Sequence, residues 1–502
     1  MVISDNIFRL IKSLTKQEKI YFKRYGGVQV KGDNNMYIKL FDEIAGMKEY
    51  DEEILKRKFK GEKFINQISV AKNYLYHAIL KTLKTMRKVE SKKEEINSLF
   101  EDVGILFAKR LYSQCRKILR KCRSIAMEYE KYPELIEILV WESKLNYADN
   151  SIKKKQTEVL NQNYEERKKY LKILENMYEY DRLEYNFTAF TREVKIKDAR
   201  YRKSLDEFIK NPMMKSEELA LSTVAKLKYN AVKSSYYYVT EDYAKSLKYE
   251  TKQVEILDKN SGIKSERFTD YLVLLSNILL LCVVLEDEDE FKKYLLKFRM
   301  QMEDKTVLKS NFYQAYIIER SYLMEMYYYN KKGEFKEAVK MYEKLHKEVD
   351  ELGIKIRDSE VVNLKYLLVA AYFGMKEYRK SLEILNEVLG DKEAEARITE
   401  YLTARLFNLI LHYEMGNMDL LEYGIDSTQK FIKERRRLSS FEKLFIKLMN
   451  RLVKCKPGEM KSEIFGEFMF ELNKIEESEY KTGLFDRVDL IEWVENKVTV
   501  KN

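Results

Sequence analysis

Proline is almost absent from this sequence, and this limits what the chain can fold into more than any other feature. Pro133, Pro212 and Pro457 are the only three prolines among 502 residues. Proline lacks a backbone N–H and clashes with the preceding helical turn, so a chain without it can be helical almost throughout. Hydrophobic residues make up 45% of the chain, which is enough for a packed core. The sequence therefore predicts an ordered all-α protein.

A recurring pattern indicates how the helices are arranged. In YYYNKKGEFKEAVKMYEKLHKEV (residues 327–349), a glycine between two helix-like runs precedes an aromatic residue. A small residue follows three positions later, and a large residue four positions after that. Similar runs lie 40 to 48 residues apart, with a weaker match at Tyr112. The anchor residues of the aligned runs are Tyr243, Phe291, Phe335, Tyr378 and Met418.

This pattern has a simple physical interpretation. The glycine permits a tight turn between two helices, and the small residue lets the helices approach each other. A single helix pair cannot bury its apolar face, so such pairs must stack. We therefore predict an α-solenoid of stacked antiparallel helix pairs, with an irregular period of about 40–48 residues. His412 aligns with Tyr329 and Tyr372, which indicates a packed turn residue.

The spacing resembles the tetratricopeptide-repeat (TPR) family, most closely over residues 322–349. It departs from the family in two ways, because the usual period is about 34 residues and the proline that often ends a repeat is absent. The stretches at residues 10–25, 411–438 and 485–498 also resemble an uncharacterised helical-repeat family from Bacteroidetes-type bacteria. The second resemblance implies repeat architecture in a cytosolic bacterial protein, and it implies no enzymatic activity.

Charge and pattern distinguish an N-terminal region from the rest. Residues 1–130 contain 28 Lys and Arg against 17 Asp and Glu, whereas the remainder has 65 of each. Near residue 90, short helices give way to long pairs. We predict a basic helical head over residues 1–92 and a TPR-like solenoid over residues 93–502 with a cap at about 440–502. Within the head, Thr15 and Glu18 match a capping box, and residues 51–87 suggest a helix-turn-helix-like arrangement.

No residue set is typical of a catalytic, metal or cofactor site. The three histidines have no metal-binding spacing. Residues 27–32 imitate the start of a phosphate loop, but Asp33 and Asn34 follow where Lys and Ser/Thr are needed. The acidic residues 286–290 lack the spaced ligands and glycine of a calcium loop. We expect no enzymatic activity, no cofactor and no metal.

The cysteines and the apolar runs indicate where such a chain resides. Four cysteines without a CxxC pair are typical of buried apolar residues in a reduced compartment. The most apolar run, residues 271–285, is shorter than the roughly 20 residues that span a membrane. We expect a cytoplasmic protein without membrane contact.

Our first functional hypothesis is a non-enzymatic scaffold that binds a peptide or helix of a partner protein. In a solenoid, the first helix of each pair lines the concave face. Tyrosine and arginine suit such a surface because they offer large contact area with polar tips. The residues expected on this face are Arg320, Tyr327, Asn330, Lys331, Asn363, Tyr366 and Phe373.

The alternative is a regulator that binds nucleic acid through its basic N-terminal quarter, with the solenoid as a sensor arm. Clustered cations would meet phosphates. An enzyme with an unrecognised site is a third hypothesis, which would require a deep pocket with converging carboxylates or histidines. The candidate phosphate contacts are Lys63, Lys72, Lys81, Lys84, Lys109, Arg110, Arg116, Lys117, Arg120, Lys121 and Arg123.

Overall fold

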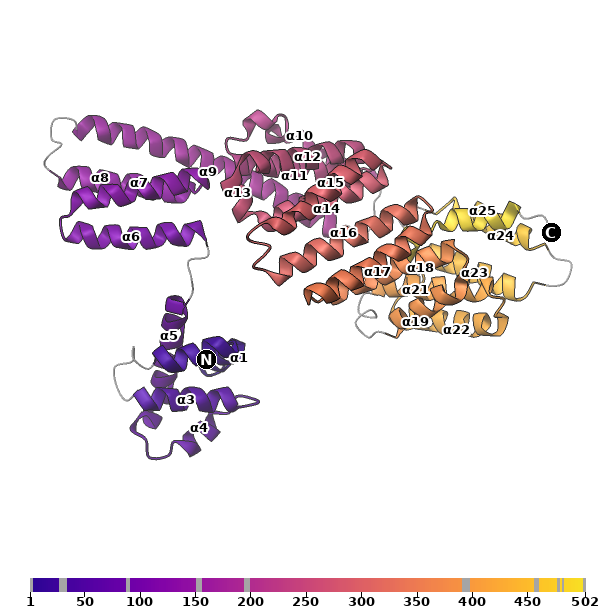
Figure 1. The fold of residues 1–502 in the computed structure, drawn as a ribbon, viewed down its shortest axis with the longest axis horizontal. Helices are drawn as coiled ribbons and strands as arrows, with labels where there is room; N and C mark the ends of the chain where they lie inside the picture. The colour runs from indigo at the N-terminus through magenta and orange to yellow at the C-terminus, as the bar shows by residue number, and fades with distance from the viewer. Residues whose placement is uncertain are drawn as a thin grey trace. The chain divides into compact units, whose positions relative to one another are not determined.

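In a computed structural model, most of the described residues lie in helices (Figure 1). None of the described residues lies in a β-strand, so the prediction of an all-α protein is confirmed. The chain divides into two compact units, Met1–Leu174 and Glu175–Asn502. The structure describes residues 3–26, 34–86, 91–149, 156–193, 199–390, 398–455, 460–475, 479–480 and 483–499.

The first unit begins with short helices packed around α5, whose Leu75 and Ile79 are fully buried. The predicted capping box is confirmed at α2, where the Thr15 hydroxyl accepts from the Glu18 amide at 3.2 Å. Longer helices then pack in sequence, α6 on α7 and α7 on α8. The helices are α1 (Ile3–Ser13), α2 (Lys16–Tyr21), α3 (Asn34–Gly46), α4 (Glu52–Lys58), α5 (Ile68–Met86), α6 (Lys92–Ala108), α7 (Tyr112–Glu128), α8 (Tyr132–Ala148) and α9 (Gln156–Glu193), which runs past the unit boundary.

The second unit is a stack of antiparallel helix pairs, which confirms the predicted solenoid. Two further helices, α10 (Ala199–Lys210) and α13 (Ser261–Glu266), lie outside the pairs. The chain ends with the 3₁₀ turn η9 (Gly483–Asp486) and α25 (Leu490–Thr499). The pairs are α11 (Thr223–Val239) with α12 (Tyr243–Lys259), α14 (Phe268–Val284) with α15 (Glu288–Met300), α16 (Asn311–Lys331) with α17 (Phe335–Leu352), α18 (Asp358–Gly374) with α19 (Tyr378–Leu389), α21 (Ile398–Glu414) with α22 (Met418–Arg435), and α23 (Ser440–Val453) with α24 (Lys461–Leu472).

The first five of these pairs share one turn geometry. The middle residue of each three-residue turn has left-handed backbone, and the next amide donates to a carbonyl five residues back, as in a Schellman motif. His412 supplies one such carbonyl to Asn417 at 2.9 Å, which confirms its place in the turn. The left-handed residues are Glu241, Glu286, Gly333, Lys376 and Gly416, with φ between 58° and 72°.

This geometry corrects the sequence alignment at one pair. The left-handed residue Glu286 makes Glu288, rather than Phe291, the structural equivalent of Tyr243 and Phe335. The alignment was therefore wrong there by three residues. Three residues are nearly one helical turn, so both registers place apolar side chains on the same face, and periodicity alone does not separate them.

Gly374 also has a different role from the one that the alignment gave it. Lys376, not Gly374, takes the left-handed turn position of this pair. Gly374 is the last residue of α18, and a Cβ atom there would lie 2.3 Å from the Phe335 ring. Glycine is required at this point for close packing of two pairs rather than for the turn.

The small residue early in the second helix acts as predicted. Ser246 and Ser381 are fully buried, and the Ser381 hydroxyl donates to the carbonyl of Val369 at 2.9 Å. The Ser246 hydroxyl donates in the same way to Ser234, also twelve residues earlier, at 3.1 Å. Each small residue thus lets its two helices approach and also satisfies its own hydroxyl.

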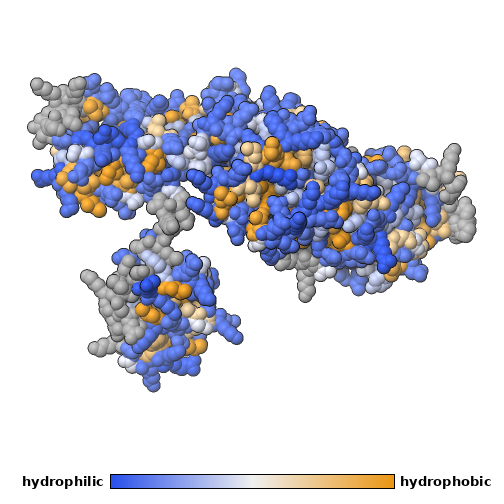
Figure 2. Space-filling view, in the orientation of Figure 1, coloured by the Kyte–Doolittle hydropathy of each residue, from blue (hydrophilic) through white to orange (hydrophobic). Residues whose placement is uncertain are grey.

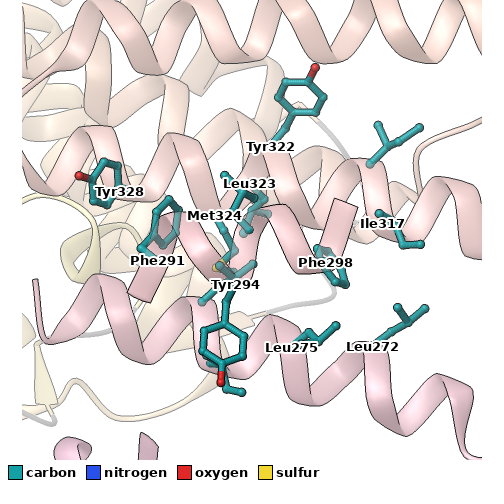
Figure 3. Close-up of a cluster of buried hydrophobic side chains, with 14 of the residues drawn as sticks. Leu272, Leu275, Phe291, Tyr294, Phe298, Ile317, Tyr322, Leu323, Met324 and Tyr328 are labelled. Atoms are coloured by element: carbon teal, nitrogen blue, oxygen red, sulfur yellow. The ribbon is translucent and has the colours of Figure 1, made fainter. Parts of the chain in front are cut away.

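The core runs from pair to pair rather than being closed within each pair. Figure 3 shows α15 side chains meeting those of α14 and α16. The rings of Phe291 and Tyr328 stack with centroids 4.5 Å apart, which joins two successive pairs. The face of the molecule seen in Figure 2 is mainly hydrophilic, with scattered hydrophobic areas.

The cysteines largely follow the prediction. Cys115, Cys122 and Cys282 are buried free thiols, while Cys455 is half-buried. Burial raises the pKa of Cys122 to about 11, so this thiol stays protonated and unreactive. Within the described ranges, no helix combines the length and apolar composition needed to cross a lipid bilayer.

Candidate functional site

The second unit contains a cleft of about 910 Å³ beside the ends of its first helices. One wall is formed by the C-terminal ends of α14, α16 and α18 with their turns. The other wall is the chain's own C-terminal segment, residues 483–499, which we call the tail. Aromatic side chains lie between the walls, and they include Tyr327, Phe335, Phe373 and Phe485.

Four of the seven residues expected on the concave face line this cleft. They are Tyr327, Asn330, Lys331 and Phe373. Lys331 is exposed and Tyr327 is half-buried. Phe373 packs against Phe407 and Tyr378, with ring centroids 5.0 Å and 5.5 Å away, and still reaches the cleft.

Asn330 and Tyr366 are interior residues, contrary to the expectation of a contact surface. The Asn330 side-chain amide donates to the carbonyl of Leu367 at 2.8 Å, which ties α16 to α18. Tyr366 is 1% exposed, and its hydroxyl donates to the carbonyl of Glu400 at 3.1 Å. The Asn330 side-chain nitrogen and the Tyr366 hydroxyl thus join successive pairs, while the buried Asn330 side-chain oxygen has no hydrogen-bond partner among the described residues.

Arg320 and Asn363 belong to a ladder of polar contacts across the first helices. The Arg320 guanidinium donates to the Ser276 hydroxyl at 3.1 Å and lies 3.6 Å from the Glu360 carboxylate. The Asn363 amide donates to Glu360 at 3.2 Å. Beside them, the fully buried Glu319 binds Arg357. Burial raises the pKa of Glu319 against the opposing effect of that arginine.

The first residues of the tail bind α18 and α21, which are the first helices of their pairs. The Arg487 guanidinium donates to the Asn363 side-chain oxygen at 3.3 Å and lies 5.6 Å from the Tyr366 ring centre. The Leu484 amide donates to the Thr403 hydroxyl at 3.2 Å. Gly483 has a φ of 56°, and a Cβ there would lie 2.2 Å from that hydroxyl oxygen, so only glycine fits.

A single carboxylate on α21 anchors the rest of the tail. Glu414 accepts from the Trp493 indole N–H at 2.8 Å and pairs with the Lys497 ammonium at 2.7 Å. The Tyr378 hydroxyl also bonds to it, and burial together with this carboxylate raises the pKa of Tyr378 to about 12. The Trp493 ring packs edge-on against Phe465 at 5.4 Å.

The tail therefore contacts more than the last pair. The sequence indicated a cap that would cover the end of the array, and α25 does pack on α24. In addition, η9 packs on α21, and Arg487 reaches α18. The tail thus forms part of the inner face.

Several of the candidate phosphate contacts in the first unit are used internally. Lys72 is 2% exposed and binds Tyr50 and Glu52, so its prediction as a phosphate contact is wrong. Arg116 pairs with Asp149 at 2.7 Å, and Lys121 lies 3.4 Å from Glu95. A buried or paired cation would have to break these internal contacts to bind a phosphate, and this costs free energy.

Arg123 is paired twice, with Glu142 and Glu166, each at 2.7 Å. Lys63 lies in the 3₁₀ helix η3 (Lys63–Gln67), and residues 59–67 connect α4 to α5. A helix-turn-helix usually has a turn of three to four residues. The candidates that are exposed and have no ion pair with a described residue are Lys81, Lys84, Lys109, Arg110, Lys117 and Arg120.

Sequence reasoning did not find the tail contacts or the role of Lys376. One local signal was present, because Trp493 and Lys497 are four residues apart and so share a helix face. Their common acceptor, Glu414, is 79 residues from Trp493, and no local pattern links the two. Among the described residues, no three His, Cys, Asp or Glu side chains are grouped to hold a metal ion.

Comparisons of the chain with protein-family models, curated proteins and solved structures found no match.

Proposed function

We propose that the chain is a protein-interaction scaffold that binds a segment of a partner protein in the cleft of the second unit. The observation that carries the proposal is the cleft itself, which opens on the first helices and has aromatic side chains between two polar walls. Exposed and half-buried aromatic residues are the usual anchors of protein contacts.

The tail supports this proposal because it is a chain segment already held on the same face. It uses an arginine, a backbone amide, an indole and an ammonium group to bind side chains of the inner helices. The resemblance to tetratricopeptide proteins also favours binding over catalysis, since such arrays use the face lined by their first helices.

The test is affinity capture with the full chain and matched variants. Tyr327→Ala and Lys331→Glu change the cleft, whereas Lys336→Glu makes the same charge change at an exposed position on α17 outside it. We expect proteins that are retained by the wild type and by Lys336→Glu to be lost from both cleft variants. Equal retention of the same proteins by all four chains would contradict the proposal.

Nucleic-acid binding is a second candidate, which the exposed cations of the first unit favour. Lys117 and Arg120 are both exposed on α7, three residues apart and so on one face. Phosphate binding would weaken steeply with salt. Fluorescence anisotropy with a labelled DNA duplex should show this dependence and its loss in Lys117→Glu/Arg120→Glu. Binding that is insensitive to salt and to these changes would exclude the candidate.

A further inference from the structure

We propose that the cleft selects a partner segment with acidic side chains along one edge, basic side chains along the other, and apolar side chains between them. This inference rests on the proposed function and adds the chemistry of the segment. The inference follows from the charged side chains on the two walls and from which of these side chains already have an ion pair or hydrogen bond within the chain.

The wall formed by α16 and α18 presents cations. Lys331 ends α16, and Lys376 occupies the left-handed turn position after α18. Both line the cleft, both are exposed, and neither has an ion pair with a described residue. Neighbouring lysines outside the cleft are paired, since Lys332 binds Glu288 and Lys380 binds Glu377.

The cationic part of this wall has a limit. Glu286, the left-handed turn residue after α14, also lines the cleft and is exposed. The positive stretch is therefore confined to the ends of α16 and α18. A partner's acidic edge would lie there rather than along the whole wall.

The wall formed by α25 presents anions. Asp489 and Glu492 line the cleft, and both are exposed. The Asp489 carboxylate accepts from the Glu492 amide at 3.0 Å, and neither carboxylate has an ion pair with a described residue. The two positions are three apart, so they lie on one helix face.

The tail's cations are bound by side chains of α18 and α21. Arg487 and Lys497 also border the cleft, but Asn363 and Glu414 hold their charged groups. The Glu414 carboxylate neutralises Lys497, whereas Arg487 is bound by neutral acceptors and keeps its positive charge at the start of the tail, two residues before Asp489. Among the described residues, the unpaired cations Lys331 and Lys376 thus lie on one wall, at the ends of α16 and α18, and the unpaired anions Asp489 and Glu492 lie on the other.

Aromatic residues between the walls complete the match. Tyr327, Phe335 and Phe373 offer apolar area to a partner's apolar side chains. Like charges placed opposite each other disfavour binding, so a reversed or single-sign segment would bind more weakly. The two walls together would thus fix the orientation of the bound segment.

The test uses a display library of random 12-residue peptides, selected against the full chain and two charge variants. Lys331→Glu/Lys376→Glu reverses one wall. Asp489→Asn/Glu492→Lys reverses the other, and asparagine keeps the side-chain oxygen that begins α25. Lys336→Glu is the control for a charge reversal at an exposed position outside the cleft.

We expect wild-type selection to enrich peptides that carry both signs of charge. The selected peptides should bind each wall variant at least tenfold more weakly, and Lys336→Glu should bind them like the wild type. New selections on each variant should lose only the charge that its altered wall recognised. Single-sign peptides, unchanged preferences in the variants, or no enrichment would overturn the inference.

A further variant separates this inference from the proposed function. If Tyr327→Ala abolishes peptide binding while both charge variants leave it unchanged, the cleft binds peptides without the proposed polarity. If the peptides bind Tyr327→Ala like the wild type, they bind elsewhere, and both proposals fail.

Discussion

Glu250 on α12 should make the stability of the second unit depend on pH. This side chain is 9% exposed and accepts a hydrogen bond from the Ser234 hydroxyl of α11 at 2.8 Å. No cation is paired with it among the described residues. Burial raises the pKa of Glu250 from 4.5 to about 7, although donors on Ser234 and Asn277 oppose the rise.

The sign and size of the effect follow from this shift. A folded-state pKa above the unfolded value means that the protonated carboxyl favours folding. Its stabilising contribution is complete below about pH 4.5 and is lost as the pH rises through about 7. One pKa unit corresponds to about 1.4 kcal/mol, so a rise from 4.5 to about 7 costs about 3 kcal/mol once the group is ionised.

Glu250→Gln should remove this cost, because the amide keeps an acceptor for Ser234 and is never charged. We expect the variant to be more stable than the wild type by up to about 3 kcal/mol at pH 8 and by no more than about 1 kcal/mol at pH 5. Thermal unfolding followed by calorimetry from pH 5 to pH 8 would measure the difference. Hydrogen exchange in α11 and α12, corrected for intrinsic rates, would locate it, since solenoids open locally.

The control is Glu255→Gln, which removes an exposed carboxylate from the same helix. It should leave the pH dependence unchanged. Parallel pH profiles for the wild type and Glu250→Gln would refute the reasoning. A Glu250→Gln variant that is less stable than the wild type at every pH would also refute it, because ionisation of the buried carboxyl would then not destabilise the fold.

Three further predictions concern packing and internal pairing. Gly374→Ala should lower the stability of the second unit by about 1–3 kcal/mol, because its methyl group would collide with a neighbouring ring; thermal unfolding measures this. Trp493→Phe and Glu414→Ala should each raise hydrogen exchange in α25, and the double variant should raise it by less than the sum of the two single effects, because both substitutions remove the Trp493–Glu414 hydrogen bond. Lys72→Met should change the thermal stability of the first unit and leave any nucleic-acid affinity unchanged, since this lysine is buried.

Local features of the fold could be predicted because their physics is local. Scarce proline and the capping box at Thr15 act within single helices, and the small residues Ser246 and Ser381 act within one helix pair. The register of α15 was wrong because a three-residue shift preserves the apolar face. No local pattern shows whether Phe291 or Glu288 is the residue of α15 that corresponds to Tyr243 and Phe335.

The cleft could be predicted only in part, because its remaining features depend on distant residues. Tyr327 and Lys331 follow from their place at the end of a first helix. Asn330 lies in the same helical turn but is buried, and its side-chain amide donates to the carbonyl of Leu367 in the next pair. Arg487 lies 124 residues beyond its acceptor Asn363, and periodicity carries no information about such a contact.

The shared turn geometry has a consequence for engineering this protein. Lys376 and Glu286 pay a conformational cost of roughly 1–2 kcal/mol at positions where glycine is favoured, and both line the cleft. Lys376→Gly would therefore remove a charge from the cleft while relaxing the backbone beneath it. Loss of binding in such a variant could not be attributed to a weakened fold. The turns thus offer substitutions in which recognition and stability change in opposite directions.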